Sequence, residues 1–311
     1  PPRSTLFPYT TLFRSQIAAG EVVERPASAV KELIENAIDA GASTISVETS
    51  EAGKRLIAVA DNGSGIPAEE LPLAMARHAT SKLQSAEDLF AIHTLGFRGE
   101  ALASIGSVAR LTLTSKPEAQ QAGYRIRVDG GVVGAVGPVP APTGSEVRVE
   151  DLFFNVPARM KFLKSDSTEN RQITGLVTRY ALAYPHIRWT LVQDQRLVFK
   201  TSGSGSQMEI LQELFGAQDS KQLLPITFTD REIRVNGFIS NLSLNRSNRK
   251  DITFFVNGRW VQDAALTAAV IKAYNTLLMV GRYPVAALFI ELPAGQVDVN
   301  VHPSKSEVQI G

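Results

Sequence analysis

The sequence predicts an α+β protein with two domains. Three observations favour this fold class: a length of 311 residues, an apolar share of 44%, and an amphipathic helix followed by a series of strand-like segments. A chain of this length and apolar content can bury two cores. We expect an atypical leader over 1–15, a first domain over 16–200 and a second domain over 207–311.

The first helix is expected to begin at Pro26, since proline suits the first helical turn, and to end at Gly41. Its apolar side chains recur every three or four residues and form one face, namely Val30, Leu33, Ile34, Ala37 and Ile38. The segments 44–47 and 56–59 alternate in polarity, which predicts a hairpin around Glu51, Ala52 and Gly53. The second of these strands leads into a glycine-containing turn over 61–65.

Later segments continue the α+β pattern. Further strands are expected over 110–114, 124–128, 146–150, 189–199, 233–239, 252–256 and 285–291, and helices over about 169–183 and 264–277. Residues 201–206 are Thr, Ser and Gly throughout and predict a linker. Residues 66–100 are mostly polar and predict a mobile lid.

Composition excludes several classes of protein. The 32 Lys and Arg residues nearly cancel the 31 Asp and Glu residues, and the net charge of +1 means that any nucleic-acid surface is local. The absence of cysteine excludes disulfides, thiolate metal sites and a cysteine nucleophile. No apolar run reaches the roughly 18 residues that cross a bilayer. We therefore expect a cytoplasmic protein that has no membrane partner.

Polar side chains gather on one face of the first helix. At about 100° per residue, Glu32, Asn36 and Asp39 fall within roughly 60° of one another. An amide oxygen suits Mg²⁺, and a carboxylate one turn earlier suits the activation of water. A polar helix face is more often simply solvated, so this signal is weak when taken alone.

Two glycine-containing segments add to this signal. Asp61 precedes Gly63 and Gly65, an arrangement in which a carboxylate accepts from the amine of adenine, although an ordinary turn is the commoner meaning. The segment 95–102 places two glycines before a helix, where free N–H groups bind phosphate, although a plain loop before a helix has the same pattern. The phosphate-binding pattern of P-loop proteins is absent from the sequence.

These three segments, in this order, resemble the nucleotide-binding motifs shared by gyrase, the heat-shock chaperone, histidine kinases and MutL. Three further segments, at residues 16–26, 77–82 and 296–305, specifically resemble the MutL family of DNA mismatch repair proteins. The resemblance covers residues 16–311. It implies an ATP-binding α/β sandwich of the Bergerat type, followed by an α+β domain similar to ribosomal protein S5.

The resemblance also implies roles for particular residues. Glu32 corresponds to the general base, Asn36 to the Mg²⁺ ligand, Asp61 to the adenine reader and Lys305 to a catalytic contact with the γ-phosphate. The remaining nucleotide contacts implied are Ala40, Gly63, Gly65, Ile66, Thr80, Ser81, Lys82, Leu95, Gly96, Phe97, Arg98, Gly99, Glu100, Ala101, Leu102 and Ser145. Ser145 departs from the family, in which threonine is commoner at this position.

The resemblance implies ATP and Mg²⁺ as cofactors and several partners. These are DNA, a second copy in an ATP-dependent dimer of N-terminal regions, a MutS-type mismatch sensor, and a downstream repair nuclease or helicase. Arg259 is a candidate for a basic DNA-contacting groove, although a turn arginine between two strands is an equally good interpretation. We expect the family's C-terminal dimerisation domain to be absent, and Ser15 departs from the arm that normally precedes Gln16.

Three other functions are weighed against this one. A histidine kinase carries its phosphoacceptor histidine ahead of the ATP domain, whereas the histidines here follow the first helix, at His78, His93, His186 and His302. A gyrase-type ATPase shares both implied folds, but the segments 16–26 and 296–305 favour MutL. A non-catalytic DNA-binding scaffold is disfavoured by Glu32, Asn36 and Lys305, and Mg²⁺-dependent ATP turnover distinguishes it from an enzyme.

Overall fold

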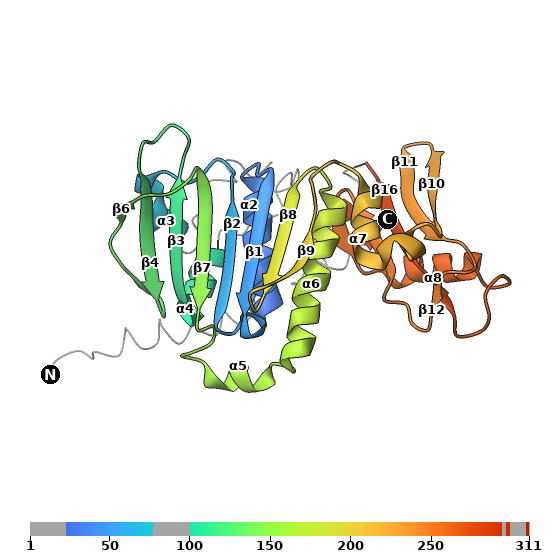
Figure 1. Cartoon of the computed structure of the whole chain (residues 1–311), viewed down its shortest axis with the longest axis horizontal. Coiled ribbons are helices and arrows are strands. Elements are labelled where there is room, and N and C mark those ends of the chain that lie inside the picture. Colours follow the sequence, from blue (N-terminus) through green and yellow to red (C-terminus); the bar gives the residue numbers. More distant parts are fainter. Residues whose placement is uncertain (1–22, 77–99, 294–296, 299–308, 311) are drawn as a thin grey trace. The chain divides into compact units, whose positions relative to one another are not determined.

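The computed structural model describes residues 23–76, 100–293, 297–298 and 309–310 (Figure 1). The expected leader over 1–15 and most of the expected lid therefore lie outside the described residues. The chain divides into two units. Unit 1 contains the described residues up to Val177 together with His186–Ser204, and unit 2 contains Thr178–Pro185 together with the described residues from Gly205 onward.

Unit 1 is built on one mixed sheet with the strand order β5-β4-β3-β7-β2-β1-β8-β9, and β6 also pairs with β4 (Figure 1). Strands β1 and β8 run parallel, and the other pairs are antiparallel. The strands are β1 (Thr44–Ser50), β2 (Leu56–Asp61), β3 (Arg110–Lys116), β4 (Gly123–Asp129), β5 (Val132–Val133), β6 (Gly137–Val139), β7 (Gly144–Glu150), β8 (Arg188–Gln193) and β9 (Arg196–Lys200). The helices are α2 (Pro26–Asp39), α3 (Leu71–Ala74), α4 (Ala101–Val108), α5 (Pro157–Phe162) and α6 (Asp166–Ala183), whose last residues belong to unit 2.

Helix α2 follows the predicted pattern closely. It begins at Pro26, and its predicted apolar face is buried at Val30, Leu33, Ile34 and Ala37. This face packs against β1 and β2, and the helix also contacts α4. The predicted hairpin is confirmed as β1 and β2, which are joined by a short 3₁₀ turn over Glu51–Gly53. Burial of the apolar face leaves Glu32 and Asn36 on the partly exposed side of α2.

Some sequence-based expectations are corrected by the structure. The segment 189–199 forms two strands, β8 and β9, because Asp194 and Gln195 adopt left-handed φ values of 49° and 64° and reverse the chain. The helix expected over 264–277 ends at Ala273 and continues as turns. The sequence analysis also missed helix α7 (Gln207–Ser220) and strand β10 (Leu223–Asp230), which begin unit 2.

Unit 2 contains a sheet with the strand order β10-β11-β16-β13-β14, in which β13 and β16 run parallel. Beyond α7 and β10, its elements are β11 (Ile233–Ser240), β12 (Asn245–Arg246), β13 (Ile252–Val256), β14 (Arg259–Val261), α8 (Ala264–Ala273), β15 (Tyr283–Pro284), β16 (Ala286–Glu291), β17 (Val297–Asp298) and β18 (Gln309–Ile310). The core of unit 2 joins this sheet to α8, whose Leu266 and Val270 pack against buried Phe254, Leu288 and Ile290.

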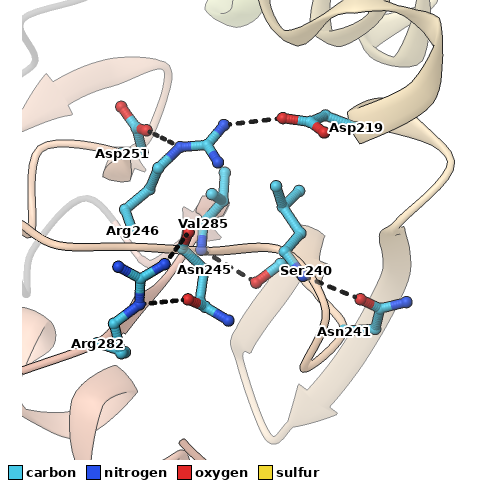
Figure 2. A network of polar contacts seen from close by, with 9 residues as sticks. Asp219, Ser240, Asn241, Asn245, Arg246, Asp251, Arg282 and Val285 are labelled. Atoms are coloured by element: carbon cyan, nitrogen blue, oxygen red, sulfur yellow. Dashed lines mark hydrogen bonds and ion pairs between the residues drawn. The ribbon is translucent and has the colours of Figure 1, made fainter. Parts of the chain in front are cut away.

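A polar network fastens the short ribbon of β12 and β15 to the rest of unit 2 (Figure 2). The Arg246 guanidinium donates Nη2 to Asp219 at 3.0 Å and Nε to Asp251 at 3.1 Å. Arg282 donates from Nε to Asn245 Oδ1 at 2.6 Å. These bonds tie the end of α7 to the segment that leads into β13, and that segment carries Arg249 and Lys250.

Candidate active site

The end of α2 and the turn after β2 lie against each other. Ser64 N donates to the Ala40 carbonyl at 2.9 Å. A Cβ atom on Gly63 would lie 2.7 Å from that carbonyl oxygen and 2.8 Å from Ala40 Cβ, so only glycine permits this approach. The structure therefore brings together two of the three segments that the sequence analysis singled out.

Asp61 ends β2 at this junction, and its carboxylate is tied to the backbone. Asp61 Oδ1 accepts from Gly63 N at 2.8 Å, and the Ser145 N–H also donates to this carboxylate. Burial raises the pKa of Asp61, and the two backbone donors oppose this shift without cancelling it. The side chain is thus a fixed hydrogen-bond acceptor at the end of β2.

Asp61 belongs to a row of three paired residues, Asp61, Ser145 and Ser115, one from each of the neighbouring strands β2, β7 and β3. Asp61 pairs with Ser145 of β7, and Ser145 pairs in turn with Ser115 of β3. Ser115 is fully buried, and its Oγ accepts from Ile66 N at 2.7 Å and lies 2.8 Å from Ser145 Oγ. The sequence analysis missed Ser115, because a serine at the end of an ordinary strand carries no local signal.

Helix α2 carries an organised cluster of charges on its polar face. Lys31 Nζ lies 3.2 Å from Glu32 Oε1 and 2.9 Å from Glu35 Oε2. Burial disfavours the Lys31 ammonium, but the two carboxylates outweigh burial and raise the pKa of Lys31. Glu32 and Asn36 are both partly exposed, one helical turn apart, and the sequence analysis missed Lys31 as the partner of Glu32.

The third segment is described in part. Glu100 is the N-cap residue of α4, and its backbone carbonyl accepts from Ser104 N at 2.8 Å. Ala101 and Leu102 lie in the first turn of α4. Helix α4 contacts α2, β3 and β4, so its first turn belongs to the same unit as Asp61.

Of the other predicted site residues, Gly65 takes a φ of 71° beside Lys116. Those outside the described residues are Thr80, Ser81, Lys82, Leu95, Gly96, Phe97, Arg98, Gly99 and Lys305.

Unit 2 holds a separate groove of about 900 Å³ that is rich in basic side chains. Arg179, Arg249, Lys250 and Lys272 line it together with Trp260. The Arg179 guanidinium lies 4.0 Å from the centre of the Trp260 ring, and burial lowers the pKa of this arginine, with Tyr180 acting in the opposite direction.

Arg259, the predicted DNA contact, is not among the lining residues of this groove. It begins β14 and pairs with Val256 across the tight turn at Asn257 and Gly258. The basic side chains that line the groove come from α6, α8 and the segment before β13, and the DNA contact of Arg259 stays a prediction.

The described part of the chain has neither a membrane-spanning helix nor a ready-made cluster of metal ligands. No helix there is long and apolar enough to cross a membrane. Among the same residues, no group of three or more His, Cys, Asp and Glu side chains has the arrangement of a metal site.

Comparisons with known proteins place this geometry in a family. Residues 24–135 match the model of the histidine kinase-, DNA gyrase B- and HSP90-like ATPases, and residues 211–311 match the model of the DNA mismatch repair protein C-terminal domain. The structure of the Aquifex aeolicus MutL ATPase domain complexed with ADP is 32% identical in sequence, with a TM-score of 0.66, over 88% of this chain and 93% of that one. This chain belongs to the MutL family.

Curated MutL proteins agree with this assignment. The DNA mismatch repair protein MutL of Streptococcus sanguinis is 45% identical over 96% of this chain, and that of Symbiobacterium thermophilum is 50% identical over 95% of it. The chain spans 46% of the length of each of these relatives. The family and the fold class predicted from the motifs are thus confirmed: an ATPase-type domain is followed by the S5-like domain of mismatch repair proteins.

Proposed function

We propose that this chain is the ATP-binding and slowly hydrolysing N-terminal region of a MutL protein, an ATP-switched matchmaker in mismatch repair. The observation that carries the proposal is the contact between Ser64 N and the Ala40 carbonyl. It joins the helix that bears Glu32 and Asn36 to the turn that bears Asp61. The proposed base for water, metal ligand and adenine acceptor are therefore carried by two segments that meet at one junction.

Each side chain has a defined task in this proposal. Asp61 accepts a hydrogen bond from the adenine amine, and Glu32 accepts a proton from the attacking water. Asn36 offers a neutral oxygen to Mg²⁺, which takes few protein ligands when phosphates supply the others. Mg²⁺ neutralises phosphate charge when it is bound. Lys305, as the motif predicts, adds a positive charge at the γ-phosphate.

Turnover by a Glu32→Gln variant tests the proposal. The amide keeps the size of the side chain but accepts no proton, so we expect turnover to fall at least about a hundredfold. ATP affinity should stay within about threefold, because the base acts on water and not on the nucleotide. Steady-state phosphate release and an equilibrium ATP titration measure the two quantities separately.

Glu35→Gln is the matched control, since Glu35 shares Lys31 with Glu32 on the same helix. This variant should lose some stability and keep its turnover per folded molecule. Equal turnover in Glu32→Gln and the unaltered chain would show that Glu32 is not the base. Loss of turnover in both variants would assign the effect to the ion pair instead.

We also propose the finer partners that the family implies. They are DNA, a second copy of this region in an ATP-dependent dimer, a MutS-type mismatch sensor and a downstream repair nuclease or helicase. The basic groove of unit 2 supports the first of these, because it concentrates positive charge on a chain whose net charge is +1. The MutL relatives support the others through their membership of mismatch repair.

A further inference from the structure

The buried hydroxyl of Ser115 joins three segments that surround Asp61. It accepts from Ile66 N at 2.7 Å, and it lies 3.1 Å from the Gly144 carbonyl oxygen and 2.8 Å from Ser145 Oγ. The side chain is completely shielded from solvent. A buried hydroxyl with three polar neighbours is costly to rearrange, because each partner would lose a hydrogen bond away from water.

The number of protons at Ser115 decides how these bonds run. A hydroxyl carries one proton and two acceptor sites, and a carbonyl can only accept. The single Ser115 proton therefore belongs on the Gly144 carbonyl, since the two oxygens would otherwise face each other at 3.1 Å without a proton between them. The Ile66 N–H occupies one acceptor site of Ser115, and the Ser145 hydroxyl donates to the other.

The bond to Ser115 determines how the neighbouring Ser145 hydroxyl can bind other groups. Once the Ser145 proton is committed to Ser115, the Ser145 oxygen can only accept from other groups. Asp61, its partner across β2 and β7, is also an acceptor. This end of β2 and β7 thus presents two hydrogen-bond acceptors side by side. Two acceptors match the amine of adenine, and they oppose the carbonyl that guanine carries at the same ring position.

We propose that Ser115 is a positioning residue for base selection, because it holds the Ser145 hydroxyl as an acceptor beside the Asp61 carboxylate. The proposal rests on the adenine role of Asp61 and adds a residue that touches no nucleotide.

The test measures the ratio of GTP to ATP dissociation constants in the whole chain. Ser115→Ala should lower this ratio on the order of tenfold, because it removes one hydrogen bond and frees the Ser145 proton. Turnover at saturating ATP should stay within about twofold, since the reacting phosphate is not involved. Ser115→Thr, which keeps the hydroxyl, should restore the ratio.

Thr114→Ala is the matched control. Thr114 is the preceding residue of β3, it is also buried, and its hydroxyl accepts from Arg125 Nε at 3.1 Å on the opposite face of the sheet. A purely structural effect would lower the unfolding midpoint of both variants and weaken ATP and GTP binding equally. Ser115→Cys, which keeps the buried volume but bonds weakly, takes the place of the alanine variant if that variant does not fold.

Two further variants separate this inference from the proposal on which it rests. Ser145→Ala should lower the ratio as Ser115→Ala does, and the double variant should lower it no further. If Asp61→Asn lowers the ratio and Ser115→Ala leaves it unchanged, the role of Ser115 is overturned alone. If Asp61→Asn also leaves the ratio unchanged, the adenine assignment fails with it.

Discussion

Asp61, the proposed adenine contact, shows how a single buried residue can oppose folding. Burial raises the pKa of its carboxyl, and the N–H groups of Gly63 and Ser145 offset this effect in part. A group whose pKa is higher in the folded chain binds its proton more tightly there than in the unfolded chain. The free energy of unfolding therefore falls as pH rises from about 3.9, the ordinary value, towards the raised pKa.

Asp61→Asn should remove this dependence. Without nucleotide, the difference in unfolding free energy should move in favour of the variant as pH rises through that window. Urea unfolding at several pH values, with the variant and the unaltered chain in parallel, measures the difference. Two curves with the same pH slope would show that the buried carboxylate titrates as it does in the unfolded chain.

Lys31 makes a related point about charge. Its ammonium is partly buried between Glu32 and Glu35, so the polar face of α2 is an organised cluster and not a solvated surface. Partly buried pairs hold their geometry better than exposed ones, because fewer conformations are open to the side chains. The candidate base is therefore held in place before nucleotide arrives.

At the scale of elements, the meeting of β2 and β7 depends on Gly144. This residue has a φ of 110°, and a Cβ atom on it would lie 2.0 Å from the Asp61 carbonyl oxygen. Any side chain would force the two strands apart beside the row of Asp61, Ser145 and Ser115. The conformation alone costs a non-glycine residue about 1–3 kcal/mol.

Gly144→Ala should therefore lower stability by at least about 2 kcal/mol and weaken ATP binding more than tenfold. Gly137→Ala on β6 is the control, since a Cβ atom there would meet nothing within 4 Å and its φ is unstrained. Thermal unfolding and ATP titration of both variants measure the two effects. Normal ATP affinity in Gly144→Ala would show that ATP binding does not depend on the close approach of β2 and β7 beside Asp61.

At the scale of the whole molecule, near-neutral net charge and a local basic groove predict weak, salt-sensitive DNA binding. Arg249→Glu combined with Lys250→Glu should weaken binding strongly and lower the salt slope by about one for each phosphate that the groove no longer neutralises. Lys221→Glu, an exposed charge reversal outside the groove, should leave the slope unchanged. Binding measured between about 50 and 200 mM salt distinguishes these outcomes, and equal slopes for all three proteins would contradict a DNA role for the groove.

The proposed ATP-dependent dimer predicts that activity depends on concentration. Separate chains must meet by diffusion, whereas two linked copies have a high effective concentration. Turnover per molecule should therefore rise with protein concentration, and a nonhydrolysable ATP analogue should increase the sedimentation coefficient. A constant turnover over a wide dilution series, together with unchanged sedimentation, would indicate an ATPase that acts as a monomer.

The sequence by itself determined the family, the fold class and two segments of the candidate site, namely helix α2 and the turn at Asp61. Helix α2 could be predicted because one apolar face and one polar face follow directly from the helical period. The turn at Asp61 could be predicted because glycine marks backbone conformations that other residues avoid. Both signals are local in the chain, so they survive without knowledge of the packing.

Only the tertiary structure decided which residues far apart in the sequence lie together. Ser115 joins the row of Asp61 through pairing across β3, β7 and β2, and the basic side chains of the groove come from α6, α8 and the segment before β13. Strand pairing and side-chain burial join residues far apart in sequence, and a local pattern carries no record of such contacts.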